Sequence, residues 1–169
     1  MNFRKTVLYA TLLCLASSAF AQDNRGNADL TIKAAKITIN YGRPSLGGRD
    51  SRLGEASDGM VWRLGMNKAT EIETTHDLIV AGKVVKAGKY TLWAKKVSGN
   101  NWLLAFHPKT GVWGDPALTE GFIAELPLKL EKAAEPVDPL TISLAEGKGK
   151  AWIKVQWGKD VLTGSFDVK

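Results

Sequence analysis

The sequence is dominated by short runs in which polar and apolar residues alternate, and glycine-rich turns separate these runs. The clearest run extends from Lys36 to Tyr41, where Ile37, Ile39 and Tyr41 recur at every second position, as they would on one face of a half-buried strand. No segment keeps an apolar period of 3.6 residues for three helical turns. The pattern therefore predicts an all-β chain of antiparallel strands.

The same alternation predicts strands along the rest of the chain, first around Leu30 and Ile32 and then at residues 69–75, 78–80, 83–85, 88–97, 101–107, 123–130, 140–144, 151–157 and 161–168. We expect irregular structure at residues 42–59, 110–121 and 131–139. Pro127 indicates an edge position for its strand, because proline cannot donate to the ladder. The order of strands and turns favours an antiparallel β-sandwich, either jelly-roll-like or a meander, with a partly closed barrel as the alternative.

The first 21 residues have the character of a secretory signal peptide. Arg4 and Lys5 precede an apolar run from Val7 to Phe20, and residues 19–21 have the small-residue pattern of a cleavage site. The run is shorter than the about 20 residues that cross a bilayer, so we expect no membrane span. The prediction is an exported protein, periplasmic or extracellular, whose mature chain begins at Gln22.

The rest of the chain is expected to form one domain over residues 29–169, after a flexible N-terminus at residues 22–28. Its size is sufficient for a core that needs no covalent staple. The single cysteine, Cys14, lies in the leader, so the mature chain has no disulfide, cysteine nucleophile or cysteine-bound metal. Removing the leader lowers the formal net charge from +6 to +4, and this charge is spread along the chain, so nucleic-acid binding is not expected.

A set of short motifs carries a resemblance to a known family. The motifs are Ile37-Thr-Ile-Asn-Tyr-Gly-Arg-Pro-Ser45, Gly48-Arg49, Val61-Trp-Arg-Leu-Gly65, Asn67-Lys-Ala-Thr-Glu71, Ala87-Gly-Lys-Tyr90 and Gly111-Val-Trp-Gly114. Their order and spacing resemble the DUF2911 family of exported bacterial proteins, from about Leu30 to Val168. The residues between Arg49 and Val61 depart from the family pattern, as does His107-Pro108. Because the family has no known function, the resemblance implies an exported single domain and no particular activity.

Arginine is unevenly distributed along the chain. Four of the six arginines, Arg43, Arg49, Arg52 and Arg63, fall in one stretch, whereas fourteen lysines and no arginine follow Arg63. Guanidinium groups are favoured where carboxylates, phosphates or backbone carbonyls are held by two hydrogen bonds. One interpretation is therefore a polar pocket at one end of the sandwich, with candidate residues Tyr41, Arg43, Arg49, Trp62, Arg63, Asn67, Glu71 and Trp113.

A structural role is the alternative for these arginines. They would pair with Glu55, Asp58, Glu71 or Glu73 and with loop carbonyls, and would hold the long loop on the sheet. The protein would then be a structural or interaction protein. Most tryptophans also have a structural interpretation, because they lie on expected strands and an indole buries a large area. Trp93, Trp102, Trp152 and Trp157 are expected in the core, and Trp113 is expected to be exposed.

The sequence offers little support for catalysis. The two histidines, His76 and His107, are not spaced as a metal pair or as the base of a nucleophile, and no G-x-S-x-G motif is present. A glycosidase-like hydrolase using Glu71 and Glu73 stays open, with the requirement that one carboxyl has a raised pKa in an open cleft. We expect a non-enzymatic binding module without metal or cofactor, whose ligand is an anionic or polyhydroxyl small molecule or a cell-envelope glycan.

Overall fold

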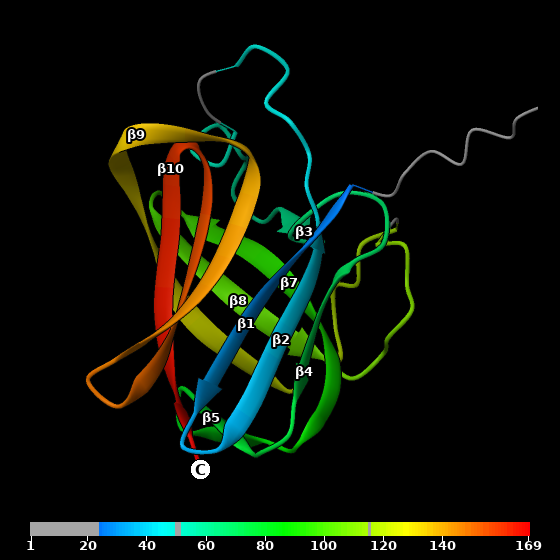
Figure 1. The fold of residues 1–169 in the computed structure, drawn as a ribbon. Helices are drawn as coiled ribbons and strands as arrows, with labels where there is room; N and C mark the ends of the chain where they lie inside the picture. Colours follow the sequence, from blue (N-terminus) through cyan, green and yellow to red (C-terminus); the bar gives the residue numbers. More distant parts are fainter. Residues whose placement is uncertain (1–23, 50–51, 115) are drawn as a thin grey trace, which may run out of the picture.

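The computed structural model describes residues 24–49, 52–114 and 116–169, so the expected leader lies outside the described residues (Figure 1). Its ten strands are β1 (Arg25–Ile32), β2 (Ala35–Gly42), β3 (Val61–Trp62), β4 (Thr70–Thr74), β5 (Leu78–Val80), β6 (Lys83–Val85), β7 (Gly88–Ser98), β8 (Asn101–His107), β9 (Ala124–Gly147) and β10 (Lys150–Val168). They form one antiparallel sheet in the order β1-β2-β4-β7-β8-β9-β10-β5-β6, with β3 paired to β7. The sheet is not closed into a barrel, and the described residues contain no helix. The all-β prediction is confirmed.

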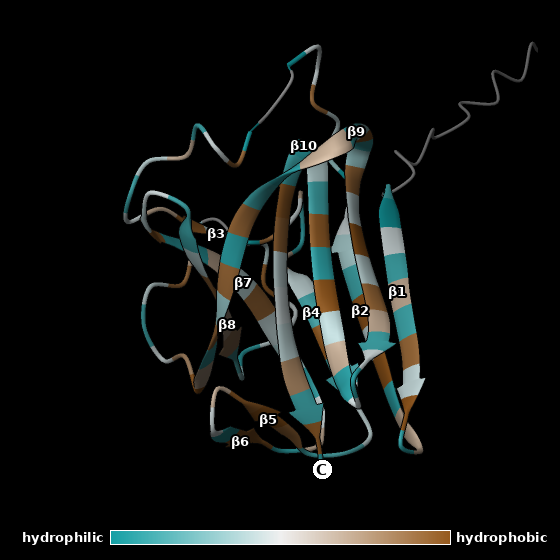
Figure 2. Cartoon of the chain, turned by 90° about the vertical axis from the view of Figure 1, so that its left-hand side faces the viewer, coloured by the Kyte–Doolittle hydropathy of each residue, from teal (hydrophilic) through white to brown (hydrophobic). Residues whose placement is uncertain are grey.

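Alternation along the strands places the core. On β2, Ile37, Ile39 and Tyr41 are buried, and the residues between them are more exposed. The resulting alternating bands of apolar and polar residues are visible along the strands in Figure 2. The apolar faces enclose a main core whose largest fully buried side chains include Trp102, Phe106 and Phe166, while Trp93 is buried in a second, smaller cluster with Ala69 and Ala105. The expected burial of Trp93, Trp102 and Trp157 is confirmed, whereas that of Trp152 is wrong, because 41% of this residue is exposed.

The two longest strands, β9 and β10, bend back on themselves halfway along. Lys150 and Asp167 are 17 residues apart on β10, and straight strand of that length would span about 55 Å. Their side chains are instead 3.0 Å apart, Nζ to Oδ2. The bend lies where the β9–β10 register shifts, around Gln156, Gly158 and Asp160. The expected strands at 123–130, 140–144, 151–157 and 161–168 are therefore the four halves of this ribbon.

The segment at residues 131–139, which was expected to be irregular, forms the bend of β9 and is continuous with the strand on both sides. The outer half of the ribbon, in which residues 141–147 pair with residues 150–156, folds back toward β1 and β2 (Figure 1). There the Tyr41 hydroxyl donates to the Ile142 carbonyl at 3.2 Å, and the Leu140 N–H donates to the Pro44 carbonyl at 3.0 Å. The outer half of the ribbon is thus attached to the same end of β2 from which the long loop departs.

Two local predictions differ from the structure. β1 begins at Arg25, inside the stretch expected to be flexible, because residues 25–32 pair with β2 along their full length. The strand of Pro127 is interior, since β9 lies between β8 and β10. Pro127 is tolerated because the pairing with β10 ends at Lys129 opposite Thr163, so no ladder hydrogen bond is needed from position 127 on that side.

Three hairpins are closed by turns whose two central residues both have positive φ. The pairs are Lys33-Ala34 at 48° and 65°, Ala81-Gly82 at 47° and 82°, and Lys148-Gly149 at 53° and 72°. Such turns have the twist of the strands they join, and they fix the register of both strands. The turn at residues 148–149 sets the pairing of the outer ribbon, in which Lys150 lies opposite Gly147.

Candidate binding site at the loop-covered end

The long loop between β2 and β3 covers the end of the sheet at which the β9–β10 ribbon bends. Two leucines of the loop, Leu46 and Leu53, are buried in the main core. Close to β3 the loop joins β7, where the Gly59 N–H donates to the Lys96 carbonyl and the Lys96 N–H donates to the Met60 carbonyl, each at 2.9 Å. The loop is therefore a packed part of the domain, although its sequence is rich in glycine and polar residues.

Two aspartates from the bend of the ribbon hold the loop backbone. Asp138 accepts a hydrogen bond from the Leu46 N–H at 2.9 Å, and Asp160 accepts one from the Gly54 N–H at 2.9 Å. Asp160 is completely buried, and its other carboxylate oxygen forms a salt bridge with Lys132. Because a buried carboxylate needs donors to replace water, Asp160 requires both the loop and Lys132 in place.

An aromatic contact adds to this attachment. The rings of Trp62 and Trp157 are stacked, with centroids 5.8 Å apart and planes 12° from parallel. The Arg52 guanidinium carbon lies 5.7 Å from the centroid of Trp157, within cation–π range. Trp62 was expected to form a pocket wall; it packs instead on a tryptophan of β10, and its N–H donates to the Gly65 carbonyl at 3.1 Å.

Two of the candidate arginines hold main-chain carbonyls. Arg63 donates through one nitrogen to the carbonyls of Asn67 and Trp113, each at 2.8 Å, and Arg43 donates to the Leu140 carbonyl at 3.3 Å. Among the described residues, every ion pair within 4 Å uses a lysine as its cation. The structural interpretation is therefore supported for loop carbonyls, whereas the acidic partners expected for the arginines are not found in this part of the chain.

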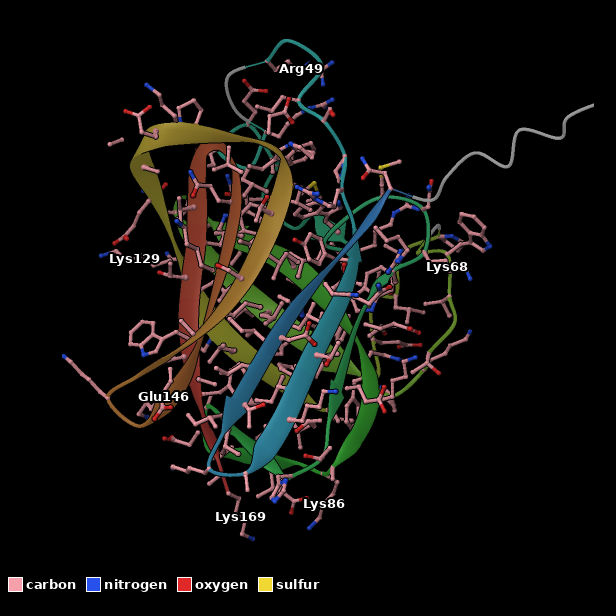
Figure 3. All side chains as sticks on the ribbon, viewed as in Figure 1. Arg49, Lys68, Lys86, Lys129, Glu146 and Lys169 are labelled. Atoms are coloured by element: carbon pink, nitrogen blue, oxygen red, sulfur yellow. The ribbon has the colours of Figure 1, made fainter. Side chains whose placement is uncertain are left out.

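Arg49 differs from the other clustered arginines because it lines an open cavity. The cavity has a volume of about 480 Å³ and is lined by Leu46, Gly48, Arg49, Pro136, Asp138 and Lys159. Arg49 and Lys159 are both exposed, and neither makes a hydrogen bond or ion pair with another described residue. Figure 3 shows Arg49 on the loop, at the extreme end of the molecule. Two cations from different elements thus line one site beside a carboxylate.

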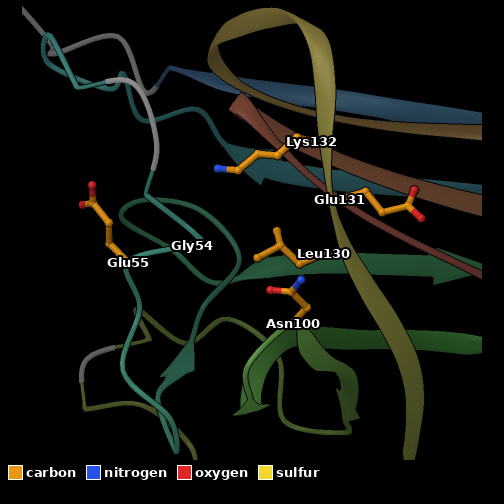
Figure 4. Close-up of a pocket in the computed structure, with 6 residues that line it drawn as sticks. All are labelled: Gly54, Glu55, Asn100, Leu130, Glu131 and Lys132. Atoms are coloured by element: carbon orange, nitrogen blue, oxygen red, sulfur yellow. The ribbon is translucent and has the colours of Figure 1, made fainter.

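A second cavity, of about 460 Å³, lies between the loop and the ribbon and is drawn in Figure 4. Its lining is Gly54, Glu55, Asn100, Leu130, Glu131 and Lys132. The only cation among the residues that line this cavity is less available to an anionic ligand. Lys132 is paired with the buried Asp160, and the Gly54 N–H is bonded to the same carboxylate. We therefore place the candidate site at the cavity of Arg49 and Lys159.

Glu71 does not have the raised pKa that a glycosidase acid would need. Partial burial acts to raise the pKa of Glu71, but the Gly111 N–H at 2.9 Å, the Lys89 ammonium at 3.2 Å and the charge of Arg25 outweigh it. The net pKa lies below its ordinary value, so this carboxylate is ionised over the usual pH range. Glu73, two residues along β4, is exposed beside a small cavity of about 170 Å³.

Apart from Trp62, which stacks on Trp157, the candidate residues fall into three groups. Arg63, Asn67, Glu71 and Trp113 meet around the loop that follows β8, with Trp113 59% exposed as expected. Tyr41 and Arg43 contact the outer half of β9. Only Arg49 lines the cavity described above, while Asp138 and Lys159 were not anticipated because they lie in a bend that the sequence does not reveal.

No group of three or more histidine, cysteine, aspartate or glutamate side chains in the described part of the chain is arranged to hold a metal ion. No helix in the same residues has the length and apolar character of a membrane span.

Comparison with known proteins gives one result. The family model described as "Protein of unknown function (DUF2911)" matches residues 24–165, which confirms the resemblance seen in the motifs. Neither a curated protein nor a solved structure matches the chain.

Proposed function

We propose a binding function for this chain, which belongs to the DUF2911 family of proteins of unknown function. The protein is an exported, non-enzymatic module that holds a small anionic sugar derivative, such as a uronic acid or a sugar phosphate, at the loop-covered end. The observation that carries the proposal is the cavity of about 480 Å³ lined by Arg49 and Lys159, two exposed cations without a hydrogen bond or ion pair to other described residues.

The lining of the cavity fits such a ligand in three respects. Its volume lies within the range of about 300–1,000 Å³ of small-molecule sites. The Arg49 guanidinium can grip a carboxylate or phosphate with two parallel hydrogen bonds, and Lys159 adds a point charge. Asp138 has one carboxylate oxygen bonded to the Leu46 N–H, so its other oxygen can accept a hydrogen bond from a sugar hydroxyl.

The site is also mechanically supported. Leu46 is buried, and its N–H is bonded to Asp138 on the bend of β9. The Gly54 N–H of the same loop is bonded to Asp160, the residue after Lys159 on β10, so hydrogen bonds and core packing join the loop that carries Arg49 to the strand that carries Lys159. Preorganisation of this kind lowers the ordering cost of binding.

The test uses glucose 6-phosphate, glucuronic acid and galacturonic acid as probes, with glucose as the uncharged control. Isothermal titration calorimetry on the purified chain should detect binding of at least one charged probe and no binding of glucose. Arg49→Ala and Lys159→Ala should each weaken binding about tenfold or more, since a hydrogen bond to a charged group contributes about 1.5–3 kcal/mol. Lys154→Ala, which removes an exposed lysine from the same strand as Lys159, is the matched control and should bind normally.

Salt and thermal stability give independent readouts. Affinity should fall as sodium chloride rises, because the exposed charges are screened. At a hundredfold excess over its dissociation constant, the ligand should stabilise the fold by about 2.7 kcal/mol. The proposal would be refuted if none of the three charged probes binds, or if the Arg49→Ala variant binds a charged probe as tightly as the unmodified chain does.

Export has its own test. In cells that express the full chain, fractionation should recover the protein outside the cytoplasm, and sequencing of the recovered chain should begin at Gln22. Recovery in the cytoplasm with residues 1–21 retained would refute export and leave the binding proposal intact.

A further inference from the structure

Another cavity lies on the flank of the molecule, where the two halves of the folded ribbon meet the turn between β5 and β6. It has a volume of about 530 Å³ and is lined by Trp152 and Lys150 from the first half of β10, Thr163 and Ser165 from the second half, and Pro127 and Lys129 from β9, among others. Figure 3 labels Lys129 and Glu146 along this flank, well away from Arg49. We call this cavity the Trp152 groove.

Trp152 is the unexpected residue of the groove. On β10, Ala151 and Ile153 point into the core, so alternation turns Trp152 outward, and 41% of it is exposed. Its indole N–H donates to the Gly147 carbonyl at 3.0 Å. A Cβ at position 147 would lie only 3.0 Å from the same edge of the ring, so the indole rests directly against the glycine backbone. The ring is thus held in one orientation and lines the groove.

The opposite side of the groove carries polar side chains from the second half of β10. Thr163, Ser165 and Asp167 alternate along β10 and are all half-buried. The hydroxyl groups of Thr163 and Ser165 make no hydrogen bond with another described residue. The Asp167 carboxylate is fixed by Lys150, whose Nζ lies 3.0 Å from Oδ2. The groove therefore has hydroxyl donors and acceptors and an oriented carboxylate opposite an aromatic ring.

The backbone of this stretch is also unpaired in the sheet. β10 pairs with β9 as far as Thr163 and pairs with β5 from Asp167, so residues 164–166 have no ladder partner. The strands nevertheless stay close, because a Cβ at Gly164 would lie 2.6 Å from the Leu128 side chain and 3.0 Å from the Pro127 carbonyl. Because residue 164 is a glycine, β10 can lie directly against β9, and no side chain at this position fills the groove.

We infer that the Trp152 groove binds a neutral pyranose unit of an oligosaccharide. The indole stacks against the apolar C–H face of the sugar ring, and Thr163, Ser165 and Asp167 bond its hydroxyls. A rigid aromatic surface beside a few convergent polar groups is the usual construction of a small-molecule site. The inference is independent of the anionic site, because it uses different residues and an uncharged ligand.

The test is a titration of the purified full chain with soluble cello-, xylo-, malto- and chito-oligosaccharides of four to six units. Isothermal titration calorimetry should detect at least one of these ligands, and binding should quench tryptophan fluorescence. Trp152→Ala should weaken that binding at least tenfold. Trp113→Ala is the matched control, because it removes another exposed tryptophan, and this variant should bind normally.

Two further variants make the result independent of the folding of Trp152→Ala. Thr163→Val keeps the branched shape and removes the hydroxyl, and it should weaken binding at least threefold. Arg49→Ala should leave oligosaccharide binding unchanged, which separates this inference from the anionic site. The inference is overturned if none of the four series binds, if Thr163→Val and Trp152→Ala both bind like the unmodified chain, or if Trp113→Ala weakens binding as much as Trp152→Ala.

Discussion

The ion pair between Lys132 and Asp160 should respond asymmetrically to removal of its two partners. The Asp160 side chain is 0% exposed, whereas that of Lys132 is 64% exposed. Lys132→Met leaves a fully buried carboxylate without its cation, which should cost about 3–5 kcal/mol of unfolding free energy. Asp160→Asn leaves a lysine that water can solvate and keeps an acceptor for the Gly54 N–H, so its cost should be about 1–3 kcal/mol.

The double variant isolates the interaction. Once Asp160 is an asparagine, Lys132→Met should cost little more, so the two changes should couple by about 2 kcal/mol or more. The pair between Lys150 and Asp167 is the control, because its side chains are 45% and 41% exposed. Lys150→Met should cost less than about 1 kcal/mol.

Urea unfolding followed by tryptophan fluorescence measures these free energies, and thermal unfolding provides a second measurement. A cost of 3–5 kcal/mol should lower the melting temperature by about 6–20 °C for a domain of this size. The reasoning is refuted if Lys132→Met costs no more than Asp160→Asn, or if the two changes are additive. Either result would mean that Lys132 contributes little to compensating the buried charge of Asp160.

Two other changes test separate parts of the structure. The lowered pKa of Glu71 means that its ionised form stabilises the fold fully above about pH 4.5 and that this contribution is lost as the pH falls through the folded-state pKa. Glu71→Gln keeps an acceptor for the Gly111 N–H. Its free energy of unfolding, measured with urea, should therefore differ most from that of the unmodified chain near pH 6 and least near pH 3. A difference that stays constant with pH would contradict the lowered pKa. Gly42→Ala would place a Cβ 2.1 Å from the Met66 carbonyl oxygen and should cost at least about 2 kcal/mol or prevent folding. Gly47→Ala, at φ 64° with open space around it, should lower the free energy of unfolding by only about 1 kcal/mol. Equal losses for the two variants would refute the close approach of Gly42 to the Met66 backbone.

Short-range pattern was sufficient to predict most strands. Alternation places β2 and β8 within a residue or two of their observed bounds, because a strand with one buried face must alternate whatever it packs against. The same logic failed for Trp152, since alternation says that one face is buried and not which one. Trp152 follows Ala151 and precedes Ile153, and the tertiary structure buries those two smaller residues.

The candidate site was only partly predictable, for a related reason. Arginine clustering drew attention to Arg49, but proximity along the chain did not place it beside Arg43 or Arg63, which hold carbonyls elsewhere. The partners of Arg49 are supplied from far along the chain by the bend of the ribbon. Asp138 contacts Leu46 across 92 residues, and no local signal specifies such a contact.

The sequence alone determined the class of the fold and the family, because alternation and short motifs each depend on residues within a few positions of one another. The tertiary structure decided where β9 and β10 bend, and this bend decided which polar groups meet. Bending the ribbon brings Lys150 to Asp167 and Asp160 to the loop, so the Arg49 cavity and the Trp152 groove both arise from long-range packing. Packing of this kind depends on the whole core, and no short segment encodes it.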